Sequence, residues 1–154
     1  MRRTDREVKD IREIEEIICK ADVCRISLAV DNFPYIVTMN FGYSVTSNRE
    51  IYFHCAGEGK KLDMISKNNF VCFEFDTDHK LYGGKNGCDW GMKFRSVVGY
   101  GNIDVITDHT EKIKAFNIIM DHYAPGEKFI FDTDSVNEAR ILKLTISEMT
   151  GKKL

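Results

Sequence analysis

The sequence predicts a mostly β protein, a small antiparallel barrel with helices packed outside it. Six segments with strand-like alternation or β-branched residues are bounded by turn residues, and the first strands follow one another without an intervening helix. Three further segments have the apolar spacing of amphipathic helices. This order favours antiparallel pairing over a parallel sheet with helical crossovers. At 154 residues, the chain is expected to form one domain over residues 1–154.

The first half of the chain supplies a helix and then strands. Residues 10–22 carry isoleucines at helical spacing, which predicts a short amphipathic helix. Residues 23–30 and 35–45 flank the turn cluster DNFP, so a β-hairpin is expected there. Side chains alternate along a strand, so Val37 and Met39 share an apolar face while Thr38 and Asn40 share a mixed one.

The remaining elements follow the same rules. The segment IYFHC, residues 51–55, is a strand with His54 on the face opposite Phe53 and Cys55. A helix that begins at glycines is expected next, and Gly99 and Gly101 in a later strand indicate a bulge or a close approach. We therefore expect helices at 56–68 and 109–123, strands at 69–76, 92–106 and 140–149, and a loop of unassigned shape at 124–139.

Composition excludes several classes of protein. The formal net charge is -2 and no basic cluster is interleaved with aromatic residues, so nucleic acid is not an expected partner. Five cysteines without a CxxC pair disfavour a disulfide framework, and the four histidines lack metal-ligand spacing. The charged N-terminus and the absence of an apolar run of about 20 residues predict a cytoplasmic protein without membrane spans.

The stretch IYFHCAGEGKKLD is the first candidate site. His54 precedes a glycine-flexible turn, and its pattern fits either a hydrogen-bonded surface histidine or a catalytic one. Lys60 and Lys61 fall in the first turn of a helix, where cations are unfavourable unless an anion is bound. They are either two solvated lysines or part of a phosphate site that the helix amides and the glycines complete. The chain has no P-loop, GxSxG or HExxH signature.

The order of several segments resembles a known family. These are MRRTDRE, DVCRISLAVDNFPYIVTMNFGY, IYFHCAGEGKKLDMI, VCFEFD, FRSVVGYGNI, IIMDHY and EMTGKK. Together they resemble the FMN-binding split-barrel proteins related to pyridoxamine 5'-phosphate oxidase, and within them the 5-nitroimidazole resistance (Nim-type) group. The resemblance implies a six-stranded split β-barrel and a homodimer with one FMN per subunit at the interface.

The resemblance also implies the site residues. Val37, Thr38, Met39 and Asn40 would border the flavin ring, His54 would lie near it, Lys60 and Lys61 would bind the FMN phosphate, and Ser96 would approach the flavin. Thr38 departs from the pattern, because many Nim-like sequences have proline at this position, so the contact with the ring is expected to differ.

The implied activity is FMN-dependent reduction of a small acceptor. A nitroimidazole nitro group reduced to an amine is one such acceptor, with His54 as proton donor or substrate orienter; FMN itself carries the redox chemistry. Two alternatives stay open at this point. The chain would be either a flavin carrier or sensor without turnover, or a haem-binding split barrel with His54, His79 or His122 as axial ligand.

Overall fold

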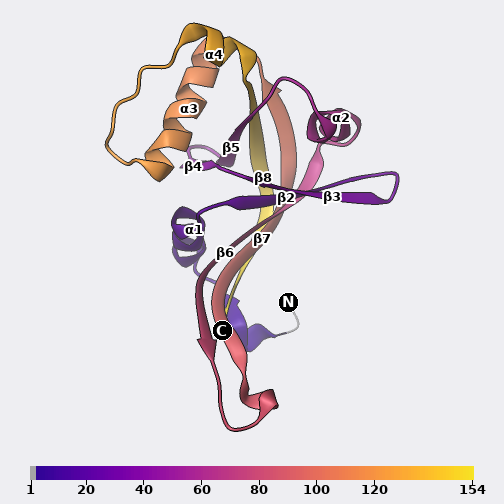
Figure 1. Cartoon of the computed structure of the whole chain (residues 1–154), viewed down its shortest axis with the longest axis vertical. Helices are drawn as coiled ribbons and strands as arrows, with labels where there is room; N and C mark the ends of the chain where they lie inside the picture. Colours follow the sequence, from indigo (N-terminus) through magenta and orange to yellow (C-terminus); the bar gives the residue numbers. More distant parts are fainter. Residues whose placement is uncertain (1–2) are drawn as a thin grey trace.

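The computed structural model describes residues 3–154, so the first two residues of the MRRTDRE segment lie outside the described chain. A mostly β, antiparallel architecture with flanking helices is confirmed (Figure 1). The strands are β1 (Glu7–Val8), β2 (Cys24–Val30), β3 (Phe33–Met39), β4 (Gly42–Val45), β5 (Arg49–Cys55), β6 (Phe70–Tyr82), β7 (Gly91–Ile106) and β8 (Arg140–Lys153). The α-helices are α1 (Ile11–Lys20), α2 (Lys60–Lys67), α3 (His109–Tyr123) and α4 (Thr133–Glu138), with short 3-10 turns at Thr4–Arg6 and Gly87–Asp89.

One sheet contains all eight strands, in the order β3-β2-β6-β7-β8-β5-β4, with β1 paired to β8. The sheet is not closed, because β3 and β4 are its two ends and pair only with β2 and β5. The hairpin of β2 and β3 extends to one side, and the ribbon of β6 and β7 extends well beyond the rest of the molecule (Figure 1). In this chain the opening of the barrel therefore lies between the edge strands β3 and β4.

The expected number of six strands is not confirmed, because the sheet has eight. The expected strand 35–45 is divided into β3 and β4, because the chain changes its pairing partner there: Met39 is the last residue paired with β2, and Gly42 is the first paired with β5. The intervening Phe41 is completely buried. Gly42 then lies so close to α3 that an added Cβ would be 2.6 Å from the backbone of Ile118. Three further strand segments and α4 were missed. They are β1, the extension of β6 from Thr77 to Tyr82, the extension of β8 from Thr150 to Lys153, and a short helix within the segment of unassigned shape.

Local signals explain most of the elements that were predicted. Asp31 and Asn32 have φ values of 51° and 61°, as a two-residue type I′ hairpin turn requires, and they join β2 to β3. The Asp108 carboxylate accepts a hydrogen bond from the Glu111 amide and thereby caps α3. The expected bulge in β7 is confirmed as a register shift between Tyr100 and Gly101. Such signals fix where elements start and turn, without fixing which strands pair.

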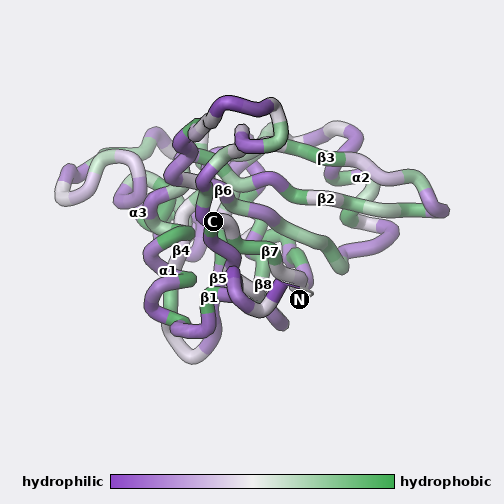
Figure 2. The backbone as a smooth tube through the Cα atoms, turned by 90° about the horizontal axis from the view of Figure 1, so that it is seen from below, coloured by the Kyte–Doolittle hydropathy of each residue, from purple (hydrophilic) through white to green (hydrophobic). Residues whose placement is uncertain are grey.

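The main hydrophobic core lies between α1 and the sheet. Ile17 and Ile18 of α1 are fully buried, together with Phe53, Phe73 and Phe75 from the strands. The tube of α1 alternates between hydrophobic and hydrophilic residues, as a helix with one buried face should (Figure 2). A smaller cluster forms where Ala115 and Ile119 of α3 contact Ile141 of β8. Within residues 3–154, no helix is long and apolar enough to cross a membrane.

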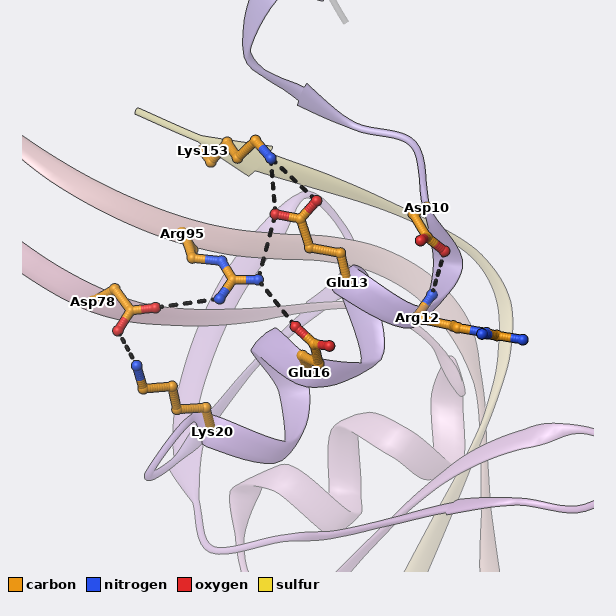
Figure 3. Close-up of polar contacts among 8 residues, drawn as sticks. All are labelled: Asp10, Arg12, Glu13, Glu16, Lys20, Asp78, Arg95 and Lys153. Carbon is orange, nitrogen blue, oxygen red and sulfur yellow. Dashed lines mark hydrogen bonds and ion pairs between the residues drawn. The ribbon is translucent and has the colours of Figure 1, made fainter.

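Ion pairs connect the polar face of α1 to the long strands β6, β7 and β8 (Figure 3). Arg95 of β7 lies 3.4 Å from Glu13 and 3.5 Å from Asp78, measured from guanidinium nitrogen to carboxylate oxygen. Lys153 contacts the same Glu13 carboxylate at 2.9 Å, and Lys20 pairs with Asp78. We call this group the Arg95 cluster; it comprises Glu13, Glu16, Lys20, Asp78, Arg95 and Lys153.

Candidate functional site

A cleft of about 330 Å³ lies at the opening of the barrel. Its walls come from the end of β3, the end of β5 and the first turn of α2. The lining residues are Val37, Thr38, Met39, Asn40, His54, Cys55, Ala56 and Lys61. Of the eight residues predicted for a flavin site, six therefore meet in one cavity, although they come from three different elements.

The wall formed by β3 offers backbone groups to a ligand. Because β3 is an edge strand paired only with β2, backbone groups along its other side lack a strand partner. Thr38 on this strand and Asn40 just after its end are exposed, whereas Met39 is buried in the core. The predicted separation into an apolar and a mixed face is thus confirmed for these residues, and the mixed face is the accessible one.

The turn Ala56–Gly59, which we call the glycine turn, directs the chain from β5 into α2. Gly59 precedes the helix with a φ of 130°, in a region that side-chain-bearing residues rarely adopt. The first helical hydrogen bonds run from the amides of Leu62 and Asp63 to the Gly59 carbonyl. The amides of Lys60 and Lys61 make no hydrogen bond within residues 3–154 and are available to an anion.

The two lysines that follow the glycine turn have different surroundings. The ammonium group of Lys60 lies 4.5 Å from the ring centroids of both Phe33 and Tyr35, so it contacts the β3 hairpin through cation–π interactions. Lys61 is half-buried, lines the cleft, and makes no ion pair or hydrogen bond within residues 3–154. Of the two, Lys61 is therefore the lysine placed to bind a ligand in the cleft.

Arg140 is a second cation at this turn, and it was not among the residues predicted for the site. Its position at the start of β8 pairs it with Cys55, and its guanidinium lies about 4.0 Å from where a Cβ on Gly57 would be. Burial raises the pKa of the Cys55 thiol, while the positive charges of Lys61 and Arg140 oppose that rise. Arg140 also makes no ion pair among the described residues. Arg140 lies next to the glycine turn because of the register in which β5 pairs with β8, and no local sequence pattern specifies that register.

His54 lies where the cleft meets a second cavity. Its side chain is exposed, and its ring centroid is 6.1 Å from that of Phe116 in α3. The adjacent Cys55 packs in the main core, so the predicted opposite orientation of these two side chains is confirmed. A catalytic Cys–His pair is accordingly not formed here. A catalytic role for His54 itself stays a prediction.

Ser96 is not brought to the cleft of its own chain. Its partner in β8 is Lys152, whereas the partner of His54 is Ile141, eleven residues away along the same strand. That separation corresponds to roughly 35 Å of extended chain. The nearby glycines also have a local explanation: a Cβ on Gly99 would overlap Phe73, and one on Gly101 would overlap the backbone of Thr145. Contact between Ser96 and a flavin stays a prediction, and within one subunit the distance opposes it.

The other two histidines considered as haem ligands already have partners in the protein. His79 Nε2 lies 2.9 Å from Asp76, and His122 Nε2 lies 2.9 Å from the Ala21 carbonyl oxygen while its ring packs on Phe41. His54 makes no hydrogen bond within residues 3–154, so it is the candidate axial ligand with a free ring. Groups of three or more metal-ligating side chains do not occur in the described part of the chain.

Comparisons with known proteins agree with this geometry. Residues 10–153 match the family model described as pyridoxamine 5'-phosphate oxidase. A candidate 5-nitroimidazole antibiotic resistance protein from Bacteroides thetaiotaomicron VPI-5482 is 34% identical, with a TM-score of 0.83 over 96% of this chain and 86% of that one. No curated protein was found to match.

Two more distant structures share the fold. The flavocytochrome Anf3 from Azotobacter vinelandii is 16% identical, with a TM-score of 0.83 over 100% of this chain and 72% of that one. The FAD and heme binding protein from Mycobacterium smegmatis is 14% identical, with a TM-score of 0.82 over 96% and 73%. The open antiparallel sheet, the cleft at its opening and the match over residues 10–153 lead to one conclusion: this chain belongs to the pyridoxamine 5'-phosphate oxidase-like family.

Proposed function

We propose that this chain binds FMN in the cleft and is a flavin-dependent oxidoreductase that reduces a small acceptor such as a nitroimidazole. The observation that carries the proposal is an unpaired cation, Lys61, beside free amides at the start of α2 and next to an open strand edge. The 34% identity to a candidate 5-nitroimidazole resistance protein supports the choice of acceptor.

The residues present fit the two ends of FMN. A phosphate needs cations and amide donors, which Lys61, Arg140 and the first turn of α2 supply around the glycine turn. An isoalloxazine ring needs hydrogen-bonding groups along one edge, which the unpaired side of β3 and the exposed Thr38 and Asn40 supply. Lys60 has a smaller role in this proposal, since its ammonium group faces Phe33 and Tyr35.

When bound, FMN would supply the electron transfer, which no side chain here can perform. His54 would orient the acceptor and deliver a proton to it at the edge of the cleft. Complete reduction of a nitro group to an amine takes six electrons and six protons and releases the two nitro oxygens as water. Three equivalents of a two-electron reductant such as NADH or NADPH would supply the electrons.

The test of this function is an absorption spectrum of the purified protein before and after addition of FMN and desalting. Flavin peaks should remain with the protein, and the released cofactor should be FMN and not FAD by chromatography. NAD(P)H oxidation that depends on a nitroimidazole should then follow. Retained flavin without turnover would favour the carrier or sensor alternative, a Soret band would favour haem, and a colourless protein that rejects FMN would refute the proposal.

A homodimer is part of the same proposal. Val98 and Tyr100 of β7 are 38% and 39% exposed, and Tyr100 stacks on the half-exposed Phe70 with ring centroids 6.0 Å apart. Such an apolar strip on a sheet is typical of a subunit interface. A partner chain is also what would bring Ser96 to a flavin. Light scattering should give twice the mass of the chain, and Tyr100→Glu should lower that mass to one chain; a monomeric wild-type protein would contradict the dimer.

A further inference from the structure

A second cavity, which we call the aromatic cavity, shares His54 with the cleft. Its volume is about 340 Å³, and its lining includes Phe116 of α3, Val136 of α4, and Ile130 and Phe131 of the preceding loop. Ile130 is fully exposed at 102%, an unusual position for a large apolar side chain. The cavity therefore places an apolar surface directly beside the candidate flavin site.

The aromatic cavity has a flat wall. The rings of Phe116 and Phe131 are stacked, with centroids 5.3 Å apart and planes inclined by 29°. The His54 ring lies 6.1 Å from Phe116 on the side that the cleft shares. Rings in this arrangement favour another planar ring through offset or edge contacts.

The wall from α4 is held in place before any ligand binds. The buried ammonium group of Lys112 donates hydrogen bonds to the carbonyls of Val136, Asn137 and Ala139 at 3.0, 3.2 and 2.8 Å. At the other end of α4, the Asp132 carboxylate accepts hydrogen bonds from the amide and hydroxyl of Ser135. The α4 wall held in this way needs little ordering on binding, which favours affinity.

The charges around the aromatic cavity disfavour an anionic ligand, and the Asp132 carboxylate is already engaged as the cap of α4. No lysine or arginine is among the residues that line it, all of which lie in the described chain, and its one ionisable acid is Asp132. Ser135 and Asp132 bond to each other, whereas His54 makes no hydrogen bond within residues 3–154. A ligand with a polar substituent would therefore direct it toward His54, and a carboxylate or phosphate would lack a counter-charge.

We propose that the aromatic cavity binds the acceptor as a neutral planar heteroaromatic ring, with its reducible substituent at the His54 end, next to the cleft. This inference rests on the flavin function proposed above. The volume suits such a ring with small substituents, since a dry cavity of about 150 Å³ already admits benzene. Phe131 and Phe116 would then determine acceptor specificity, separately from the residues that hold the flavin.

The test is calorimetric binding of metronidazole, a neutral nitroimidazole, to the flavin-loaded protein and to Phe131→Ala. We expect Phe131→Ala to weaken binding roughly threefold to tenfold, as loss of one aromatic contact predicts. Phe129→Ala is the matched control, because Phe129 lies in the same loop and is 39% exposed but does not line the cavity. Flavin content should equal that of the wild type in both variants, and a nitrobenzoate should bind more weakly than metronidazole.

The remaining outcomes distinguish failure of this inference from failure of the proposed flavin function. Equal metronidazole affinity in both variants, or tighter binding of the nitrobenzoate, would overturn the aromatic cavity as the acceptor site while the flavin function stands. Flavin-loaded protein that binds no metronidazole would overturn it too. If Ile130→Asp abolishes dimerisation, a second copy covers the cavity, and the inference fails. Absence of flavin from the wild type would instead refute the function on which the inference rests.

Discussion

The cations of the Arg95 cluster have carboxylate partners in the protein, whereas those at the glycine turn have none in the described part of the chain. In the cluster, Arg95 has Glu13, Glu16 and Asp78 within ion-pair distance (Figure 3). At the glycine turn, Lys61 and Arg140 have no carboxylate partner within residues 3–154. A half-buried cation without a protein partner is poorly compensated until an anion arrives. The difference indicates that the cluster stabilises the fold, whereas the glycine turn is arranged for a ligand.

The largest expected effect is the loss of FMN affinity on substitution of Lys61. We expect Lys61→Ala to weaken FMN binding roughly 10- to 100-fold, because a charge-assisted hydrogen bond contributes about 1.5–3 kcal/mol. The unfolding temperature of the flavin-free protein should stay unchanged, since Lys61 has no partner to lose. Titration of flavin fluorescence gives the affinity. Lys67→Ala, at the exposed end of the same helix, is the control; equal affinities in the two variants would remove Lys61 from the phosphate site.

Substitution of Arg95 should destabilise the fold and leave FMN binding intact. Arg95→Met should lower the free energy of unfolding by about 1–2 kcal/mol, because a partly exposed ion-pair network is worth more than a single surface pair but less than a buried one. FMN affinity should not change. Urea denaturation measures the stability, and Lys114→Met, which removes one exposed pair with Glu111, should leave the free energy of unfolding nearly unchanged because water screens this pair. Loss of flavin affinity in Arg95→Met would break the proposed division of roles.

The smallest expected effect is the contribution of Asp78 to the stability of the protein at acidic pH. The hydrogen bond from Lys20, with the charge of Arg95, lowers the pKa of Asp78 below its usual value. A group with a lowered folded-state pKa stabilises the protein above its unfolded pKa of about 3.9, and that contribution is lost as the pH falls through the folded-state pKa. Wild type should therefore lose more stability than Asp78→Asn between pH 5 and about pH 3. Asp104→Asn, at a residue without an ion pair, should behave as the wild type does; equal acid sensitivity of all three proteins would contradict this account.

The periodicity of the sequence was sufficient for most of the elements. Alternation assigned Thr38 and Asn40 to the mixed face, which the structure exposes, and it placed His54 and Cys55 on opposite faces. The isoleucine spacing located α1. It could not divide 35–45 into two strands, because that break occurs where the chain changes its pairing partner from β2 to β5, beside the close approach of α3 to Gly42. It also could not find α4, a helix of six residues that is too short for a periodic signal.

The sequence by itself determined the β-rich class, the faces of the strands and, through family resemblance, six residues that line the cleft. Only the tertiary structure distinguished the surroundings of Lys61 from those of Lys60, placed Arg140 beside Gly57, and formed the aromatic cavity. It also placed Ser96 of β7 opposite Lys152, far from the cleft. The physical reason is that periodicity and turn chemistry act over a few residues. Strand register and helix docking instead depend on contacts between segments far apart in the chain, which no local pattern specifies.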